Sequence, residues 1–229
     1  MNLFIYVEGQ EEEMFVNRVL RNHLAPFGVI VQKPLLAATS FRIGDDEQPE
    51  VTVGGVTTYK PIRADILDYY ESGVIRPDDR LTTLVDLYAL PRNFPAHEDA
   101  IAQGLKGNAK AEQIEQAWKA DIGHPNFFPY IQVHEFEALI LTRPTVLTDL
   151  YAEHGLEIEA LRAECAPYRT PEEINETKEN SPSHRIKARV PNYVKEDGFR
   201  FLQTIGIPEL KVHCPRFKVW MELCESFFP

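Results

Sequence analysis

The sequence predicts an α/β fold, with a mostly parallel central sheet flanked by helices and a helical region toward the C-terminus. Short apolar runs alternate with segments of helical periodicity over residues 1–142. Three of these apolar runs end in acidic residues. Such placement is typical of open α/β sheets, whose ligands bind at the carboxyl ends of the strands. After residue 142 the alternation stops and helical segments dominate.

A strand–helix–strand unit opens the chain. Residues 2–7 form an apolar, β-prone run that ends in Glu8 and Gly9, and glycine permits a tight turn there. Apolar residues recur at three- and four-residue spacing over 12–27, which predicts a helix that ends at Pro26 and Gly28. A second strand is predicted over 29–36. A βαβ unit favours a parallel sheet with a right-handed crossover.

The next segment predicts a loop followed by a second helix and strand. Residues 37–58 have no clear period and include Gly54 and Gly55, so they predict a loop or an irregular hairpin. A loop this long in a compact domain is often functional. Residues 59–70 predict a helix, and residues 81–85 predict a strand that ends at Asp86.

A third unit completes the core. Residues 90–95 break the chain, and a helix is predicted over 109–122. Residues 127–133 predict a strand that delivers His134 and Glu135 to a helical run over 136–141. We therefore predict a core over 1–142 and a helical C-terminal region over 143–229 that packs on it. Further helices are predicted over 144–154, 157–165, 193–205 and 215–227, with Thr170 and Pro171 starting another.

The acidic strand ends predict a site for a divalent metal ion. Glu8, Asp86 and the cluster Glu135/Glu137 each follow an apolar run. Parallel strands would bring them to one edge of the sheet, within roughly 8 Å of one another, and Mg²⁺ prefers such hard oxygen ligands. The alternative is that Glu8 is a solvated turn residue and that the acidic residues after it only complement a helix dipole.

Composition narrows the class of protein. The 229 residues are 44% hydrophobic, enough for a full core, and hold no apolar run long enough for a transmembrane helix. The three cysteines are odd in number and lack CxxC spacing, which argues against a disulfide scaffold and structural zinc. Residues 134–138 read HEFEA rather than HExxH, which argues against a zinc protease. The absence of a signal peptide at residues 1–10 favours a reducing, cytoplasmic setting.

Charge is unevenly distributed. The formal net charge is −11, which argues against nonspecific coating of nucleic acid. Residues 183–218, however, hold eight Lys or Arg against three acids, a balance of +5. Candidates for phosphate contacts in this segment are Arg185, Lys187, Arg189 and Lys195. The alternative is a solvated helix face.

The ordered set of motifs resembles the Toprim fold of topoisomerases, primases and overcoming-lysogenization-defect nucleases. More closely, it resembles a Toprim-like group, the domain of unknown function family 4276. The stretches that carry the resemblance run over nearly the whole chain: Val7-Glu8-Gly9-Gln10 with Glu12, Gly54-Gly55 with Tyr59, Val85-Asp86-Leu87-Tyr88 with Leu90-Pro91, Pro129-Tyr130-Ile131, His134-Glu135-Phe136-Glu137-Ala138-Leu139, Pro171-Glu172 with Ile174-Asn175, Pro182-Ser183 with Arg185-Ile186, Pro191 with Tyr193 and Lys195, and Cys214-Pro215 with Phe217 and Trp220.

The resemblance implies roles for individual residues. In Toprim proteins the first glutamate acts as a general acid or base or as a metal ligand, and Glu8 holds that place. A later Asp-x-Asp pair binds Mg²⁺, but here it reads Asp86-Leu87-Tyr88, so the second aspartate is missing. Glu135 or Glu137 would then supply the absent ligand. Because the two point in different directions in a strand or a helix, we expect only one to reach the metal and favour Glu135.

The function implied is a Mg²⁺- or Mn²⁺-dependent nuclease that hydrolyses DNA or RNA, with one or two metal ions and with Glu8, Asp86 and Glu135 as catalytic residues. Kinship with Toprim nucleases also implies a bacterial setting, a separately encoded ATPase partner and a role in defence against phage. The alternative is a Toprim-like module that has lost an acid and serves as a non-catalytic regulatory or binding module docked on an ATPase partner.

Overall fold

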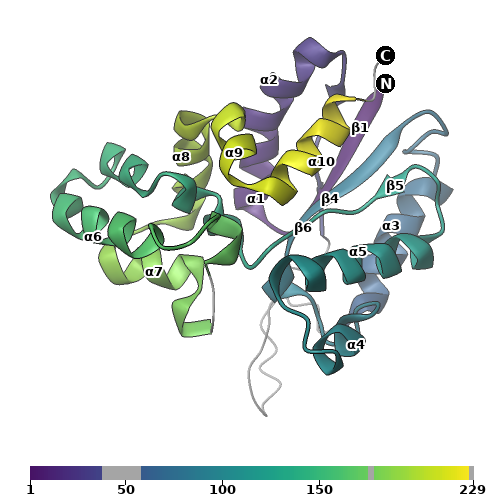
Figure 1. Ribbon diagram of the computed structural model, residues 1–229. Coiled ribbons are helices and arrows are strands. Elements are labelled where there is room, and N and C mark those ends of the chain that lie inside the picture. The colour runs from purple at the N-terminus through teal and green to yellow at the C-terminus, as the bar shows by residue number, and fades with distance from the viewer. Residues whose placement is uncertain (38–57, 175–177, 227–229) are drawn as a thin grey trace.

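The computed structural model describes residues 1–37, 58–174 and 178–226. Its six strands are short: β1 (Asn2–Val7), β2 (Ile30–Val31), β3 (Leu35–Leu36), β4 (Arg80–Asp86), β5 (Phe127–Phe128) and β6 (Ile131–Gln132). The sheet order is β2-β1-β4-β5, with β3 also beside β1 and β6 also beside β4 (Figure 1). Every pairing among these strands is parallel. The predicted α/β class with a mostly parallel sheet is confirmed.

Strand β1 is buried on both faces. Leu3, Ile5 and Val7 belong to one apolar cluster, and Phe4 and Tyr6 belong to a second cluster on the other face. This alternation follows from the two-residue period of a strand. Both faces therefore need a covering layer of helices, as is usual for parallel sheets.

One long helical segment covers the first face. It consists of α1 (Gln10–Phe15), the π-helical η1 (Val16–Leu20), α2 (Arg21–Leu24) and the 3₁₀ turn η2 (Ala25–Phe27). Gly28 ends it with φ of 72°, a left-handed conformation that glycine adopts without strain. The helix predicted over 12–27 is therefore present and begins two residues earlier.

The predicted second and last strands each form as two short segments. Pro129, between β5 and β6, has no N–H to donate to β4. The Thr83 hydroxyl accepts a hydrogen bond from Tyr130 N at 2.9 Å and donates one to Tyr130 O at 2.7 Å. The Thr83 side chain thus replaces the backbone hydrogen bonds between β4 and the next strand at the point where Pro129 interrupts them.

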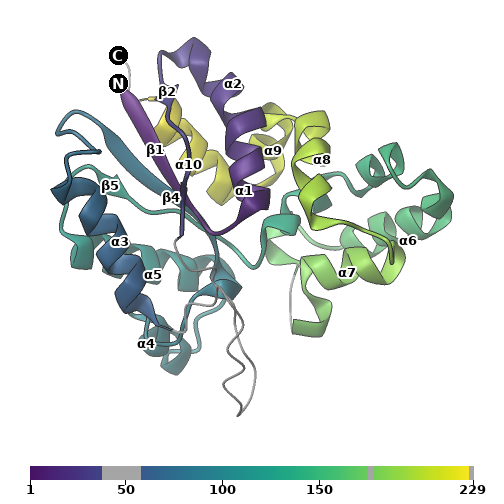
Figure 2. The same ribbon diagram turned by 180° about the vertical axis from the view of Figure 1, so that it is seen from behind.

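The second face is covered by α3 (Tyr59–Glu71) and α5 (Gly107–Ile122), with η3 (Leu87–Ala89) and α4 (His97–Ala102) beyond the carboxyl end of β4 (Figures 1 and 2). Both long helices were predicted, within two residues at their starts. Helix α4 was not predicted, because six residues are too few to show a helical period. The loop or hairpin predicted over 37–58, with Gly54 and Gly55, lies almost wholly outside the described residues.

The C-terminal region is helical, as predicted, but built from shorter pieces. It contains η4 (Phe136–Ala138), η5 (Ile140–Thr142), η6 (Pro144–Asp149), η7 (Ala152–His154), α6 (Gly155–Cys165), η8 (Pro171–Glu173), η9 (Lys178–Asn180), α7 (Pro182–Arg189), η10 (Lys195–Asp197), α8 (Gly198–Ile205), α9 (Ile207–His213) and α10 (Pro215–Glu225). Helices α6 and α7 lie side by side away from the sheet, whereas α8, α9 and α10 lie against the first helical segment (Figure 2). Thr170 holds the N-cap position of η8 but its side chain makes no capping hydrogen bond.

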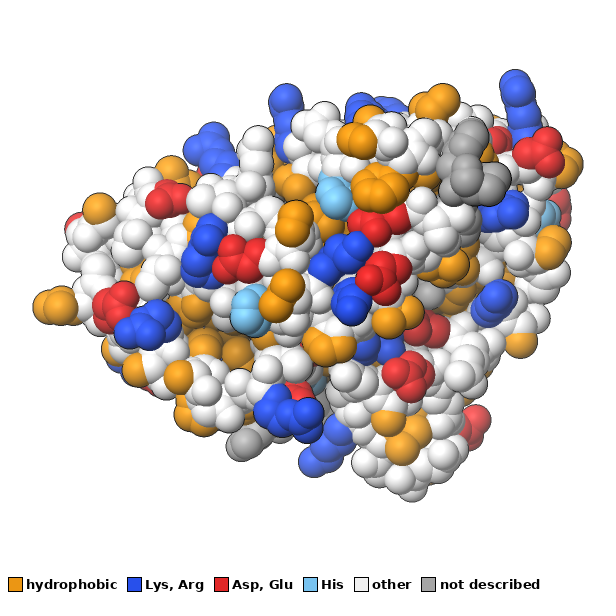
Figure 3. All heavy atoms as spheres, turned by 45° about the horizontal axis from the view of Figure 1, so that its top comes forward, with side chains coloured by type: hydrophobic (Ala, Val, Ile, Leu, Met, Phe, Trp, Pro, Cys, Tyr) orange, Lys and Arg blue, Asp and Glu red, His pale blue; other side chains and the backbone are white. Residues whose placement is uncertain are grey.

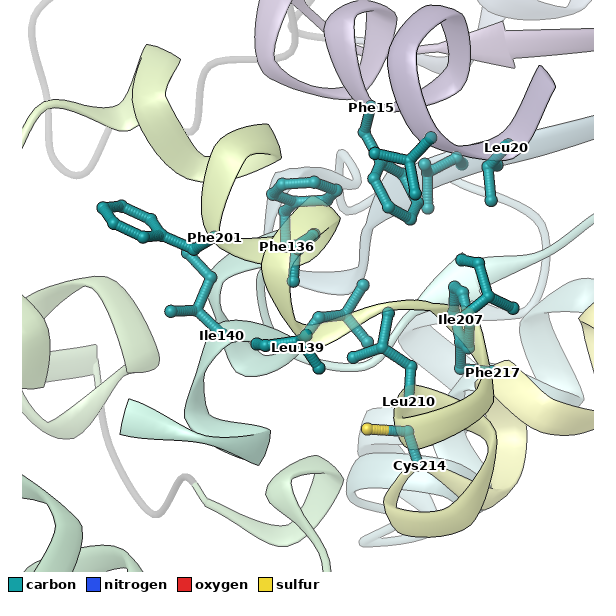
Figure 4. Close-up of a cluster of buried hydrophobic side chains, with 14 of the residues drawn as sticks. Phe15, Leu20, Phe136, Leu139, Ile140, Phe201, Ile207, Leu210, Cys214 and Phe217 are labelled. Carbon is teal, nitrogen blue, oxygen red and sulfur yellow. The ribbon is translucent and has the colours of Figure 1, made fainter. Parts of the chain in front are cut away.

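The first apolar cluster joins the two ends of the chain. Phe15 packs edge-on against Phe136, with ring centroids 5.4 Å apart, and lies 6.3 Å from the ring of Phe217 (Figure 4). Phe201 of α8 and Leu210 of α9 belong to the same cluster. The core and the C-terminal region therefore share one interior. Among the described residues, no helix is long and apolar enough to cross a membrane.

Candidate functional site

The site begins where β1 and β4 end. Because these strands are parallel neighbours, with Val7 opposite Leu84, their carboxyl ends lie side by side. Glu8 follows β1, and Asp86 is the last residue of β4. The Asp86 N–H donates a hydrogen bond to Glu8 Oε2 at 3.3 Å. Both residues keep part of their surface exposed, so this edge of the sheet opens to solvent.

Two further carboxylates enter from the first turn of α1. Glu11 is 8% exposed and Glu12 is 5% exposed, although both are charged residues at a helix start. The Gly9 N–H donates to Glu12 Oε2 at 3.0 Å, which fixes that carboxylate over the turn. Neither residue was predicted to join the metal site, although Glu12 belongs to the motif that resembles Toprim-like proteins. A signal was present, because both precede the buried Phe15 by three or four residues and so share its face.

The structure separates the two acids that follow β6. His134 has φ of 68°, a left-handed conformation unusual for a residue with a side chain, and Glu135 after it is extended. Glu135 Oε2 accepts a hydrogen bond at 2.9 Å from the N–H of Ser183, near the start of α7. Glu137 is fully buried, and it, rather than the favoured Glu135, interacts with Glu8, Glu11, Glu12 and Asp86.

We call Glu8, Glu11, Glu12, Asp86 and Glu137 the carboxylate group. Burial raises the pKa of Glu12 to about 7, and repulsion from Glu137 adds to this. Burial is also the main cause that raises the pKa of the other four carboxyl groups. Repulsion between members of the group adds to this for Glu8, Glu11 and Asp86, and repulsion from Glu135 adds to it for Glu137. Holding these charges together without a cation is therefore costly.

One cation of the chain already lies at the carboxylate group. Lys195 Nζ is 2.9 Å from Glu137 Oε1, and it lowers the pKa of all five carboxyl groups. Burial acts to lower the pKa of Lys195 itself, but Glu137 and the other acids outweigh burial and raise it. The side chain remains 45% exposed, so Lys195 reaches the group from its solvent-facing rim.

Helix α8 approaches the carboxylate group closely through a glycine. A β-carbon at Gly198 would lie 2.1 Å from Glu11 Oε1 and 3.4 Å from Phe136 Cε1. Only a residue without a side chain fits there while Glu11 keeps its position. The C-terminal region therefore contributes both Lys195 and Gly198 to this site, and neither was predicted to contact these carboxylates.

The chemistry of the group fits a hard divalent cation. Glu11 Oε1, Asp86 Oδ1 and Glu137 Oε2 are buried and have no hydrogen-bond partner among the described residues. Carboxylate oxygens are the ligands that Mg²⁺ and Mn²⁺ accept. As the side chains stand, however, no three acidic, histidine or cysteine side chains of the described part of the chain are arranged to hold an ion. Rotation of carboxylates would be needed to bring the oxygens onto one ion.

His134 and Tyr88 lie against each other, and Glu135 acts on both. Their ring centroids are 5.5 Å apart, and the Tyr88 N–H donates to His134 O at 3.3 Å. Burial lowers the pKa of His134 to about 4, so the imidazole is neutral at pH 7. Burial raises the pKa of Tyr88 to about 12, and Glu135 adds to this effect. Tyr88, at the place of the missing second acid, is therefore a neutral phenol.

Most of the basic segment is engaged in contacts within the chain. Arg185 donates to Asn180 O and to the Tyr168 hydroxyl, and Arg189 pairs with Glu164. Lys195 pairs with Glu137, which leaves Lys187 exposed on α7. On the face that Figure 3 shows, Lys and Arg side chains are spread among acidic and apolar ones rather than gathered in one basic patch.

Comparisons with known proteins add a family and a set of distant structural matches. The family model described as "Domain of unknown function (DUF4276)" matches residues 7–224. The search of curated proteins found no match. Among solved structures, the chain is similar to the C-terminal region of the OLD protein of Xanthomonas campestris pv. campestris. A structure phased with platinum has a TM-score of 0.37 and 16% identity and covers 96% of this chain and 94% of that one. A second, phased with iodine, has a TM-score of 0.37 and 15% identity and covers 96% of both chains.

Proposed function

We propose that this chain, which belongs to the DUF4276 family, is a Mg²⁺- or Mn²⁺-dependent nuclease that hydrolyses phosphodiester bonds in DNA or RNA. One observation carries the proposal. Among the described residues, three buried carboxylate oxygens without a hydrogen-bond partner come from Asp86 at the end of β4, Glu11 of α1 and Glu137 of η4, in a group whose charges repel one another. The resemblance of the Val7-Glu8-Gly9 and Asp86 motifs to Toprim proteins points to the same chemistry.

The residues divide the work according to their contacts. Asp86, Glu11 and Glu137 would hold the ion, because each has a buried oxygen without a partner in the part of the chain that the structure describes. When bound, the ion would supply a Lewis acid that orients the phosphodiester and lowers the pKa of an attacking water. Glu8 would take the proton of that water, because its raised pKa makes the carboxylate a better proton acceptor. The nucleic-acid backbone would lie toward Lys187, the exposed cation of α7.

The biological setting belongs to the same proposal. The chain would act in bacteria with a separately encoded ATPase, as a defence effector against phage. Its support is the resemblance to Toprim nucleases, and cleavage would then need the ATPase partner to be present. The test below therefore includes the cognate ATPase as one arm.

The test is a cleavage assay on DNA and RNA with Mg²⁺ or Mn²⁺, with and without the ATPase. We expect Asp86→Asn and Glu8→Gln each to lower the rate by about 10³-fold or more, as is typical when a group acting directly in catalysis is removed. Matched controls are Asp78→Asn and Glu71→Gln, exposed acids near the opposite edge of the sheet, which should cut like the wild type. If wild type fails to cut with either ion and the cognate partner, or if Asp86→Asn cuts as well as wild type, the nuclease proposal is wrong.

A second function has its own observation. The Lys195–Glu137 ion pair and the neutral Tyr88 also suit a non-catalytic Toprim-like module that docks on an ATPase partner. Measuring how tightly wild type and Glu8→Gln bind the ATPase, during titration with Mn²⁺, separates the two functions. A module without catalysis would bind the ATPase equally well in wild type and Glu8→Gln, would show no cleavage, and would not need the ion for that binding.

A further inference from the structure

The carboxylate group already contains a positive charge, that of Lys195. We propose that the Lys195 ammonium occupies the place that a second divalent ion would take, so that the site binds one divalent ion rather than two. This inference rests on the proposed metal site but not on cleavage. It assigns Lys195 to the site itself, in contrast to the expectation that this residue contacts phosphate.

Lys195 contacts the buried Glu137 directly. Glu137 is 0% exposed, and an ionised carboxylate at such a position needs a cation or a full set of hydrogen bonds. Lys195 Nζ at 2.9 Å is the cation that meets this need. Its chain enters beside the buried Tyr193, and Gly198 follows three residues later against Glu11. The short segment 193–198 is therefore positioned to keep the ammonium at the group.

Three carboxylate oxygens of the group already have a partner. Glu137 Oε1 is taken by Lys195, Glu12 Oε2 by the Gly9 N–H, and Glu8 Oε2 by the Asp86 N–H. Glu135 is not a member of the group, and its Oε2 accepts a hydrogen bond from the Ser183 N–H. Among the described residues, the buried oxygens of the group without a hydrogen-bond partner are Glu11 Oε1, Asp86 Oδ1 and both oxygens of Glu137, of which Oε1 is the one that Lys195 pairs with.

Oxygens that are buried and have no other partner are available to coordinate an ion. Mg²⁺ takes only a few protein oxygens and completes six-fold coordination with water. Three oxygens suffice for one such ion. A two-metal site needs two sets of ligands about 4 Å apart and a group that bridges them. Glu137 interacts both with the other acids of the group and with Lys195, so the ammonium already binds the carboxylate that a second ion would share.

Isothermal titration with Mn²⁺ alone, in the absence of nucleic acid, tests the inference. We expect one ion per wild-type chain and two per Lys195→Met chain, in which the ammonium is gone and Glu137 Oε1 is free. Lys195→Arg keeps the charge and should still bind one ion. Lys33→Met, which removes an exposed lysine from the segment between β2 and β3, should behave as wild type.

Thermal unfolding supplies a readout that does not depend on stoichiometry. Without metal, Lys195→Met should unfold at a lower temperature than wild type, because the carboxylate group has lost its cation. Excess Mn²⁺ should raise the unfolding temperature of Lys195→Met by more than it raises that of Lys195→Arg. If the lysine had a purely structural role, Mn²⁺ would raise both temperatures equally.

The possible outcomes separate this inference from the nuclease proposal. One ion per wild-type chain with no cleavage would support the inference and count against the nuclease. Two ions per wild-type chain would overturn the inference even if the protein cuts nucleic acid. Unchanged stoichiometry in Lys195→Met would also overturn it, and if that variant does not fold, two ions bound to Lys195→Arg would do the same.

Discussion

Two sets of buried carboxylates in this protein differ in what their oxygens do. Glu172 is 2% exposed, and both of its oxygens accept backbone N–H groups at the start of α10, from Arg216 at 3.1 Å and from Phe217 at 3.0 Å. Glu11 and Glu137 are buried to a similar degree, yet each keeps an oxygen without a hydrogen-bond partner among the described residues. Burial alone therefore does not mark a ligand site. The unmatched oxygen is the distinguishing feature.

The largest effect is expected where a matched carboxylate is removed. Glu172→Ala deletes two charge-assisted hydrogen bonds and leaves the first N–H groups of α10 unpaired. We expect a loss of about 3 kcal/mol in the free energy of unfolding, measured by urea denaturation. Glu173→Ala, the exposed neighbour, should change it by less than about 0.5 kcal/mol. Equal effects at the two positions would remove Glu172 from the class of structural carboxylates.

The next effect concerns the unmatched set. A divalent ion that binds only the folded state adds about 2.7 kcal/mol at a concentration of 100 times its dissociation constant. We expect Mn²⁺ to stabilise wild type by this amount and Asp86→Asn by much less at the same concentration, in thermal or urea unfolding. Asp78→Asn should respond as wild type does. Equal stabilisation of wild type and Asp86→Asn would place the ion elsewhere.

A smaller effect is expected at the glycine that lies against Glu11. Gly198→Ala forces the β-carbon into Glu11 Oε1, and we expect a loss of about 2 kcal/mol, as for other overpacked sites. Gly155, which likewise begins a helix, has nothing within 4 Å of the position of a β-carbon. Gly155→Ala should therefore be neutral or stabilise by about 0.5 kcal/mol, through the unfolded chain. Urea denaturation of the two variants measures this difference. We also expect Mn²⁺ to bind Gly198→Ala more weakly than wild type and to bind Gly155→Ala as it binds wild type.

The smallest effect is a gain in stability. Without metal, Asp86→Asn relieves repulsion in the carboxylate group, and two charges about 4 Å apart in water repel by about 1 kcal/mol. We expect the variant to be as stable as wild type or about 1 kcal/mol more stable in chelator-treated buffer. A clear loss of stability would mean that Asp86 is matched like Glu172.

Features of this site that depend on local sequence could be predicted, and features that depend on tertiary contacts could not. The order of strands and helices and the acids Glu8 and Asp86 follow from local patterns, because a strand end is visible in a short window of sequence. The choice between Glu135 and Glu137 does not. It depends on the left-handed turn at His134, which neither a strand nor a helix pattern includes. Lys195 reaches Glu137 across 58 residues, a contact that only the tertiary fold creates.

The packing of Phe15 against Phe217 joins a segment that is translated early to one that is translated late. About 200 residues separate the two rings, and a ribosome adds about 5 to 20 residues each second. The amino-terminal strand and helix therefore leave their apolar face uncovered by α10 for about 10 to 40 s, until that helix has been translated. During that time the exposed face is a target for chaperones and for association with other nascent chains, so translation speed over the last third of the message should influence the yield of folded protein.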